Sequence, residues 1–337
     1  MNKKIVFTKP CTAEFLEEEC KPVSGTLVKV RTLISTVSCG TERANIVGKE
    51  MVSYSSGEAA KFPLQSGYSS SGIVEEVGEA VKSVKVGDHV AMFWTTHSKY
   101  NIMDEYNVVK IIDDSISFEE AALLHVANFP MAAIRKTRLE IGESALVMGL
   151  GILGQIAVKL LKAAGAVPIV AVDPIKERRE EAIRNGADYA FDPFEDGFAE
   201  KVKKVTNGGA NVCIEVTGVG AGLDGALDCM ACFGRVALLG CTRTADFSIN
   251  YYQKVHGPGI SLIGAHTLAR PDFESAPGYF THRDDMIASM KLIIGGRLTL
   301  KDMIKETHTP ENCAEVYNRL VSDNNFPTVV QFDWRNV

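Results

Sequence analysis

The sequence predicts an α/β protein of two domains, one built on a doubly wound parallel sheet and one smaller and rich in β-strands. From Ser144 onward, short apolar runs alternate with helical runs, a pattern typical of parallel sheets covered by helices. A glycine-rich turn joins the first of these apolar runs to a helix. In the first third of the chain, short strand-like runs are separated by glycines, as in small barrels or rolled sheets.

The change of pattern near Ser117 gives the expected domain border. We expect residues 1–118 to form the β-rich domain and residues 119–295 the parallel-sheet domain. Residues 296–337 are expected to return to the first domain, ending in a strand. A chain of 337 residues fits two domains of roughly 100–200 residues each.

Strand signals in the first domain are Leu27 to Thr32, Ser71 to Val77 and His89 to Phe93. The remaining expected strands and helices follow in two sets. The strands are Ala145 to Met148, Pro168 to Val172, Val212 to Val216, Val236 to Leu239, Leu262 to Ala265 and Thr328 to Phe332. The helices are Phe118 to Leu124, Phe129 to Leu139, Leu153 to Ala164, Glu177 to Asn185, Asp284 to Ile294 and Pro310 to Val321.

Composition excludes several classes of protein. The formal net charge of -6 argues against a broad basic surface for nucleic acid. No apolar run reaches the length of about 18 residues typical of a membrane span. The start of the chain lacks the apolar core of a signal peptide, so the eight cysteines are expected to be reduced thiols. We expect a cytoplasmic protein with a small-molecule substrate, and neither nucleic acid nor membrane as a partner.

The strongest motif is the turn Gly149-Leu150-Gly151-Ile152-Leu153-Gly154. It follows an apolar strand and opens a helix, the context in which G-x-G-x-x-G marks a Rossmann dinucleotide site. The first glycine permits the tight turn, the second admits a pyrophosphate, and the third allows close packing of helix on strand. The helix N-terminus offers free N–H groups and a partial positive charge to phosphates. The alternative is a plain loop and helix cap.

An acidic residue, Asp173, ends the second strand of this domain at about the expected 20 residues from the glycines. A carboxylate there binds the ribose hydroxyls and repels a 2′-phosphate, which favours NAD as the cofactor over NADP. Arg178, one helical turn later, can meet either the ribose or a phosphate.

The chain as a whole resembles the medium-chain dehydrogenase/reductase family, the zinc-type alcohol and polyol dehydrogenases. The matching segments are Gly87-Asp88-His89-Val90, the glycine motif and Glu215-Val216-Thr217-Gly218. Cys39-Gly40-Thr41-Glu42-Arg43, Gly67-Tyr68-Ser69-Ser70-Ser71-Gly72, Ala265-His266 and Trp334 resemble the bacteriochlorophyllide dehydrogenase-like and bi-domain branch. The resemblance implies a GroES-like amino-terminal domain, a carboxyl-terminal tail that rejoins it, and homodimers or homotetramers. It also assigns Thr217, Gly240 and His266 to the cofactor site.

The sequence departs from the zinc enzymes of this family at the metal. Cys39 stands at the first ligand position, but Tyr68 and Ser69 replace a His-Glu pair, and Leu124 or His125 falls near the third. A catalytic zinc needs three protein ligands of Cys, His or carboxylate type. We therefore expect no metal, although a zinc site rebuilt from Cys39, His125 and one further group is an alternative. The family's four-cysteine lobe is also missing, since residues 88–110 contain no cysteine.

Without zinc, a proton carrier has to serve the alcohol oxygen. The resemblance makes Thr41 the proton-relay hydroxyl, places Tyr68 where its phenol can donate to a carbonyl oxygen, and puts His97 on a segment that lines the substrate pocket. Each has an alternative: Thr41 as a helix cap, Tyr68 as a packed side chain and His97 as an exposed loop residue. Glu42 and Arg43 follow Thr41 in the same motif, and for them the alternative to a contact with substrate is a structural ion pair.

The expected function is NAD-dependent hydride transfer between the nicotinamide and a secondary alcohol or its ketone, on a polyol, sugar or cyclitol. One alternative is a nucleotide-binding sensor or scaffold that lost catalysis with its zinc. Another is a dehydrogenase of a large ring substrate, as in the bacteriochlorophyllide branch.

Overall fold

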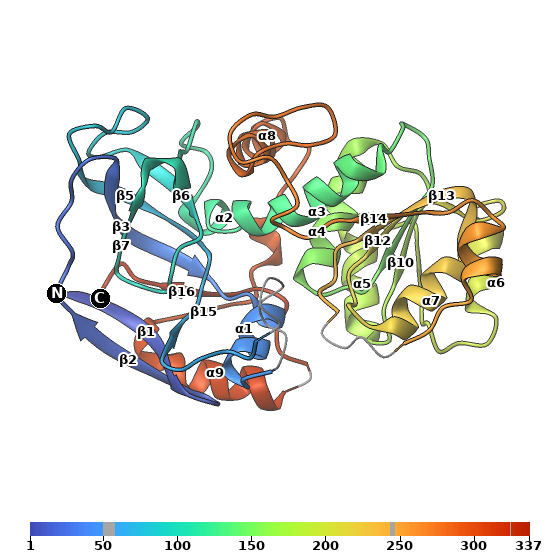
Figure 1. Ribbon diagram of the computed structural model, residues 1–337, viewed down its shortest axis with the longest axis horizontal. Helices are drawn as coiled ribbons and strands as arrows, with labels where there is room; N and C mark the ends of the chain where they lie inside the picture. Colours follow the sequence, from blue (N-terminus) through green and yellow to red (C-terminus); the bar gives the residue numbers. More distant parts are fainter. Residues whose placement is uncertain (50–57, 243–246, 324) are drawn as a thin grey trace. The chain divides into compact units, whose positions relative to one another are not determined.

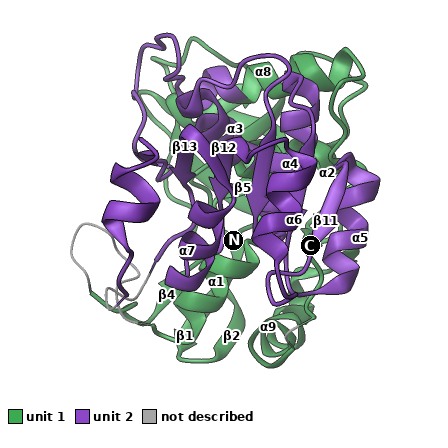
Figure 2. Ribbon diagram, turned by 90° about the vertical axis from the view of Figure 1, so that its right-hand side faces the viewer, with its two compact units in different colours: residues 1–126, 286–337 green, residues 127–285 purple. Residues whose placement is uncertain are grey.

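A computed structural model describes residues 1–49, 58–242, 247–323 and 325–337. The chain divides into two compact units. Unit 1 comprises residues 1–126 and 286–337, and unit 2 comprises residues 127–285 (Figure 2). The sequence analysis expected the domain borders after residues 118 and 295.

Unit 1 is built on two sheets. A three-stranded antiparallel sheet has the order β2-β1-β4, and a seven-stranded sheet has the order β15-β16-β3-β5-β6-β8, with β7 pairing β3. The carboxyl-terminal strand β16 pairs antiparallel with β3, Gln331 opposite Thr36, so the last strand of the sequence joins a strand that precedes residue 37 (Figure 1). The strands are β1 (Asn2–Lys9), β2 (Thr12–Glu18), β3 (Leu27–Thr36), β4 (Leu64–Gln65), β5 (Ser69–Val77), β6 (His89–Phe93), β7 (Tyr100–Asp104), β8 (Val108–Lys110), β15 (Glu306–His308) and β16 (Val330–Asp333).

Helices of unit 1 include α1 (Cys39–Ile46), α2 (Phe118–Ala121) and α9 (Cys313–Ser322). One core joins α9 to β1 and β16, with Phe7, Tyr317, Phe332 and Trp334 fully buried within it. Phe7 meets Tyr317 edge to face at 4.8 Å between ring centroids, a favoured geometry for aromatic pairs. This core fixes the helix that brings Tyr317 toward α1.

Unit 2 holds a six-stranded sheet in which every neighbouring pair is parallel, in the order β11-β10-β9-β12-β13-β14. This is the strand order of dinucleotide-binding sheets and confirms the predicted fold class. The strands are β9 (Ala145–Met148), β10 (Ile169–Val172), β11 (Tyr189–Phe191), β12 (Ala210–Glu215), β13 (Met230–Leu238) and β14 (Ser261–Gly264). Its helices are α4 (Ile152–Ala164), α5 (Lys176–Asn185), α6 (Phe198–Val205), α7 (Gly220–Asp228) and the five-residue η2 (Tyr252–His256).

Two long helices, α3 (Leu124–Thr137) and α8 (His282–Ile294), cross the borders between the units in sequence. The sequence predicted a helix from Phe118 to Leu124, but α2 ends at Ala121 and α3 begins at Leu124. Among the described residues, no helix combines the length and the apolar character that a membrane span requires.

A buried ion triad ties the start of α8 to α3 and to the segment after β14. Asp285 accepts from Arg135 Nε at 2.8 Å and from Arg270 Nη1 at 3.1 Å. Arg270 also donates to the carbonyl of Asn128 at 2.8 Å. Burial raises the pKa of the Asp285 carboxyl, while Arg270 and Arg135 pull it down. The triad anchors the segment that begins at His266.

We expect Asp285→Ala to lower the free energy of unfolding by about 3–5 kcal/mol, because it leaves the buried Arg270 guanidinium without its counter-ion. Lys201→Ala removes an exposed ion pair with Glu195 and is expected to cost about 0–1 kcal/mol. Urea denaturation of the two variants measures both. Equal losses would contradict a supporting role for the triad.

Candidate active site

The turn after β9 is held by close contacts that exclude side chains. Gly149 has φ +96, and a Cβ there would lie 3.0 Å from Thr217 Cγ2. A Cβ on Gly154 would lie 1.9 Å from the Gly149 carbonyl oxygen. Both glycines are therefore required by the protein itself, as the motif predicts.

Gly151, unlike Gly149 and Gly154, is not surrounded by atoms that would exclude a side chain. Its φ is -68, which any residue adopts, and a Cβ built on it meets nothing within 4 Å. It is the N-cap of α4, whose first residues Ile152 and Leu153 carry backbone N–H groups at the positive end of the helix. Among the described residues no contact requires a glycine here, whereas the expected approach of a pyrophosphate to the backbone would require one.

Asp173 lies directly after β10 and turns its buried carboxylate toward the glycine turn. Oδ2 accepts the Leu150 N–H at 2.8 Å, and Oδ1 accepts the Ile175 N–H at 2.8 Å. Arg178 Nη1 is 3.8 Å from Oδ2. The carboxylate is thus fixed in place, and Arg178 lies near enough to neutralise part of its charge.

Three further residues predicted for the cofactor lie at the same carboxyl edge of the sheet, after β12, β13 and β14. Thr217 donates from its N–H at 2.8 Å and from its hydroxyl to the buried Glu215 carboxylate. A Cβ on Gly240 would lie 2.3 Å from the Gly218 nitrogen. His266 Nδ1 accepts the Leu268 N–H at 3.2 Å, and burial lowers the pKa of its imidazole, as does Lys136. Glu215 therefore holds the Thr217 loop. The sequence analysis named Glu215 only as part of a family motif and gave it no role of its own.

In unit 1, two hydroxyl groups contact the phenol of Tyr68. The Tyr68 phenol hydrogen-bonds with the Ser38 hydroxyl and with the Thr41 side chain. Burial raises the pKa of the phenol, Glu42 raises it further, and the two hydroxyl partners only partly oppose this. Tyr68 therefore stays protonated at neutral pH. The structure brings Thr41 and Tyr68 together and adds Ser38, which the sequence did not single out.

A fully buried carboxylate, Glu42, lies beneath these hydroxyls. Its oxygens are 3.2 and 3.1 Å from His97 Nε2, Oε1 accepts the Ser38 N–H at 2.7 Å, and Oε2 accepts the Tyr317 hydroxyl. Burial raises the pKa of the Glu42 carboxyl, but His97, Tyr317 and Ser38 together outweigh it and leave the pKa below its usual value. Glu42 is therefore an anion at neutral pH.

His97 is fully buried in this network and lies neither on an exposed loop nor on an open face. Its Nδ1 is 2.7 Å from Ser35 Oγ, which also accepts the indole N–H of Trp334 at 2.9 Å. Because the ionised Glu42 carboxylate only accepts hydrogen bonds, His97 Nε2–H donates to it, and Nδ1 shares the other hydrogen bond with the Ser35 hydroxyl. Such a His97 supports Glu42 rather than presenting a proton to solvent.

The expected pairing of Glu42 with Arg43 is wrong. Glu42 turns inward to His97, whereas Arg43 donates to the backbone carbonyls of Val321 and Asp323 at 3.2 and 3.1 Å. The two side chains leave α1 in different directions because neighbouring residues on a helix do not share a face.

The described residues at the family's zinc position are Cys39, Ser69 and His125, beside Tyr68. The Cys39 sulfur lies 3.5 Å from the Pro327 carbonyl oxygen. Ser69 donates to the Ala122 carbonyl at 2.7 Å, and His125 packs edge to face on Tyr68 at 5.6 Å between centroids. Within the described ranges, no three His, Cys, Asp or Glu side chains are grouped so as to hold a metal ion.

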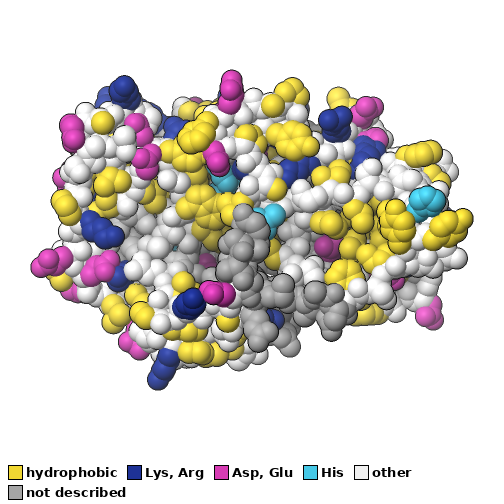
Figure 3. Space-filling model, in the orientation of Figure 1, with side chains coloured by type: hydrophobic (Ala, Val, Ile, Leu, Met, Phe, Trp, Pro, Cys, Tyr) yellow, Lys and Arg dark blue, Asp and Glu magenta, His cyan; other side chains and the backbone are white. Residues whose placement is uncertain are grey.

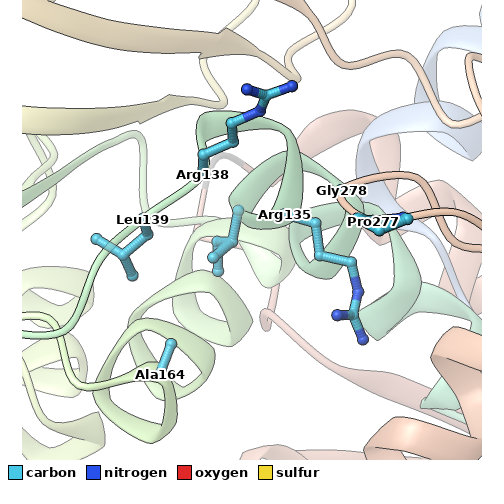
Figure 4. A pocket seen from close by; sticks show the side chains of 7 residues that line it. Arg135, Arg138, Leu139, Ala164, Pro277 and Gly278 are labelled. Atoms are coloured by element: carbon cyan, nitrogen blue, oxygen red, sulfur yellow. The ribbon is translucent and has the colours of Figure 1, made fainter.

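A cavity of about 580 Å³ lies at the end of α3 and is lined by Ile134, Arg135, Arg138, Leu139, Ala164, Pro277 and Gly278. Figure 4 shows the Arg135 and Arg138 side chains pointing away from each other, so they do not converge on one anion. No predicted site residue lines this cavity.

Two alanine variants separate the roles of the glycines. Gly154→Ala is expected to lower the free energy of unfolding by about 1–3 kcal/mol, because its Cβ overlaps the Gly149 carbonyl. Gly151→Ala is expected to leave stability unchanged, because its Cβ meets nothing within 4 Å, and to weaken NAD binding about tenfold or more, because the Cβ would enter the space expected for the pyrophosphate. Thermal unfolding and calorimetric titration with NAD measure both. Undiminished NAD affinity in Gly151→Ala would exclude a cofactor at this turn.

Comparison with known proteins gives the family. Residues 27–129 match the alcohol dehydrogenase GroES-like domain, and residues 153–277 match the zinc-binding dehydrogenase domain. D-Guloside 3-dehydrogenase of Escherichia coli is 26% identical over 345 residues, covering 96% of this chain and 97% of that protein. (R,R)-Butanediol dehydrogenase of Bacillus subtilis is 33% identical over 183 residues, covering 47% of this chain and 53% of that protein.

The crystal structure of 2R,3R-butanediol dehydrogenase from Bacillus subtilis superposes with a TM-score of 0.81 at 22% identity, covering 99% of both chains, which shows a shared fold. The two domain matches cover the chain in the order in which the two units follow each other. The chain therefore belongs to the zinc-type medium-chain dehydrogenase/reductase family of nicotinamide-dependent oxidoreductases.

Proposed function

We propose that this protein transfers a hydride between NAD and a secondary alcohol or its ketone, on a polyol, sugar or cyclitol, without a catalytic zinc. The observation that carries the proposal is the Tyr68 phenol, held by the Ser38 and Thr41 hydroxyls at the position of a lost zinc ligand. Bound NAD supplies the hydride chemistry. The chain's own residues have to serve the oxygen of the substrate.

Tyr68 donates a hydrogen bond to the ketone oxygen as the hydride reaches the neighbouring carbon, and its proton completes the alcohol. The hydroxyl of Thr41, a partly exposed residue, passes its proton to the phenol oxygen and takes a replacement proton from water. In the oxidation direction the chain runs in reverse: Tyr68 takes the alcohol proton as its own proton passes to Thr41, and Thr41 releases a proton to water. A phenol whose pKa is raised by burial suits this role, because it remains a donor at neutral pH.

Asp173 supports NAD rather than NADP as the cofactor. Two backbone N–H groups fix its carboxylate at the end of β10, where it meets the adenosine ribose in this fold. A 2′-phosphate would face this anion. Arg178, 3.8 Å away, moderates the repulsion, so the preference for NAD is a difference in affinity rather than a complete exclusion of NADP.

A polyol or sugar substrate is supported by the surroundings of Tyr68 and by the relatives. Trp94 is 39% exposed, has φ 61, and places its ring 6.1 Å from that of Tyr68. A bulky residue in the left-handed region is held by its surroundings, here by its N–H bond to the Tyr68 carbonyl at 2.9 Å. The exposed indole offers an apolar face to the C–H side of a sugar ring. Relatives named for D-guloside and butanediol act on hydroxylated substrates of this kind.

Turnover with NAD is expected on a panel of polyols, sugars and cyclitols, with a lower rate on NADP. Tyr68→Phe is expected to lower kcat roughly 100-fold by removing the proton donor. Tyr100→Phe, a variant of a tyrosine that packs against Lys29, serves as the matched control and should keep full activity. The readout is NADH absorbance, with zinc measured in the same sample.

Full activity in Tyr68→Phe, or activity that depends on added zinc, would contradict the metal-free mechanism. Tight NAD binding without turnover on any alcohol or ketone would favour the sensor or scaffold function instead.

We also propose that the protein forms a homodimer through the edge strand β14. β14 is the last strand of the sheet in unit 2, and Leu262 on it is 40% exposed. Phe233 on β13 and Tyr252 on η2 are 79% and 71% exposed. Hydrophobic side chains gather at the end of unit 2 where Figure 1 places β13 (Figure 3). A second copy pairing with this edge would satisfy its backbone groups and cover the apolar side chains.

Leu262→Glu is expected to shift the protein from dimer to monomer, because it places a charge against its own copy across the two-fold axis. Ile141→Glu, at an apolar residue that is 90% exposed before β9, is the control and should leave the dimer intact. Light scattering after gel filtration measures the mass. A monomeric parent protein would contradict the proposal.

A further inference from the structure

Ser38 is an N-cap serine whose hydroxyl does not cap its helix. At this position a serine hydroxyl ordinarily accepts a hydrogen bond from the first turn. In this protein the Ser38 hydroxyl makes no capping bond to α1 and instead hydrogen-bonds with Tyr68. Helix α1 therefore lacks the stabilising cap bond from Ser38, whose hydroxyl binds the Tyr68 phenol instead. The helix itself does not explain this choice of partner.

Glu42 makes that choice of partner possible. Its Oε1 accepts the Ser38 N–H at 2.7 Å, one turn back along α1, and this bond fixes the backbone of Ser38. Tyr317 from α9 and His97 hold the remaining lone pairs of the carboxylate. With Ser38 fixed through its backbone, its side chain is available to Tyr68.

His97 contacts the chain on the other side of Tyr68. The backbone N–H of His97 donates to the Ser66 carbonyl at 2.9 Å. A Cβ on Gly67 would lie 2.9 Å from the ring atom Cδ2 of His97. His97 therefore packs directly against the residue before Tyr68, whose φ of +97 also requires glycine. The Glu42–His97 pair thus fixes Tyr68 twice, at its backbone through Gly67 and at its hydroxyl through Ser38.

We propose that Glu42, held by His97 and Tyr317, is the positioning residue of the active site and sets the direction of the Tyr68 hydroxyl. This inference rests on the proposed function, in which Tyr68 is the proton donor. Stability alone does not explain the pair, because replacing both partners of a buried hydrogen bond by apolar groups of the same shape is often neutral or stabilising. A proton donor must be held within about 0.5 Å of its productive position, and a buried network of donors around a carboxylate does this.

A double-mutant cycle tests the inference. Glu42→Gln keeps the size of the side chain and is expected to lower kcat roughly 10- to 100-fold, while KM for NAD stays unchanged. In the Tyr68→Phe background, Glu42→Gln is expected to lower kcat less than about twofold, since the group it positions is gone. Glu306→Gln, at a half-exposed carboxylate paired with Arg319 in the same unit, is the control and should not change kcat.

Multiplicative losses in the double variant would overturn the proposal, because they would show that Glu42 acts independently of Tyr68. Thermal unfolding is measured for every variant. Tyr317→Phe keeps the ring against Phe7 but removes one bond to Glu42, so it replaces Glu42→Gln in the cycle if that variant does not fold.

Crystal structures of the parent protein and of Glu42→Gln give a readout that does not require turnover. We expect the Tyr68–Ser38 bond to be lost in the variant and the Ser38 hydroxyl to accept an N–H from the first turn of α1. An unchanged Tyr68–Ser38 bond would overturn the inference whatever the activity. Release of Tyr68 in a protein that turns over no alcohol would leave the positioning role intact and reject the proposed function.

Discussion

The contact between α4 and the turn after β9 constrains the whole of unit 2. A Cβ on Gly154 would lie 1.9 Å from the Gly149 carbonyl oxygen, so only a helix without a side chain at this point can start so close to the strand. The same approach puts the N-terminus of α4 in line with the Asp173 carboxylate, which accepts the Leu150 N–H. One steric fit therefore places the positive end of a helix and an acidic group at the same edge of the sheet.

A comparable constraint in unit 1 is electrostatic rather than steric. A carboxylate removed from water must have donors for its oxygens, and Glu42 receives them from Ser38, His97 and Tyr317. Satisfying Glu42 thereby fixes α1, the segment of His97 and α9 against each other. The Tyr68 phenol lies at the boundary of this network, where Ser38 and Thr41 are its partners.

The local parts of the site were predictable because their signals are local. One strand–turn–helix–strand unit contains Gly149, Gly151, Gly154 and Asp173. The steric requirements of that unit concern residues close together in the sequence, so a short motif reveals them. Thr41 and Tyr68 were proposed as site residues from family motifs. The sequence could not show that His97 is buried, since a Thr-His-Ser segment has the polarity of an exposed loop.

The partners of Glu42 show where sequence reasoning ends. Arg43 was the obvious neighbour by distance along the chain, yet the carboxylate binds Tyr317, which is 275 residues away. By itself the sequence determined the doubly wound sheet, its glycine turn and the acid that follows it, because backbone sterics and hydrophobic periodicity act over a few residues. The tertiary structure alone decided which side chains surround Glu42 and Tyr68, because a buried charge is stabilised by whichever donors the packed core brings within reach, wherever they lie in the chain.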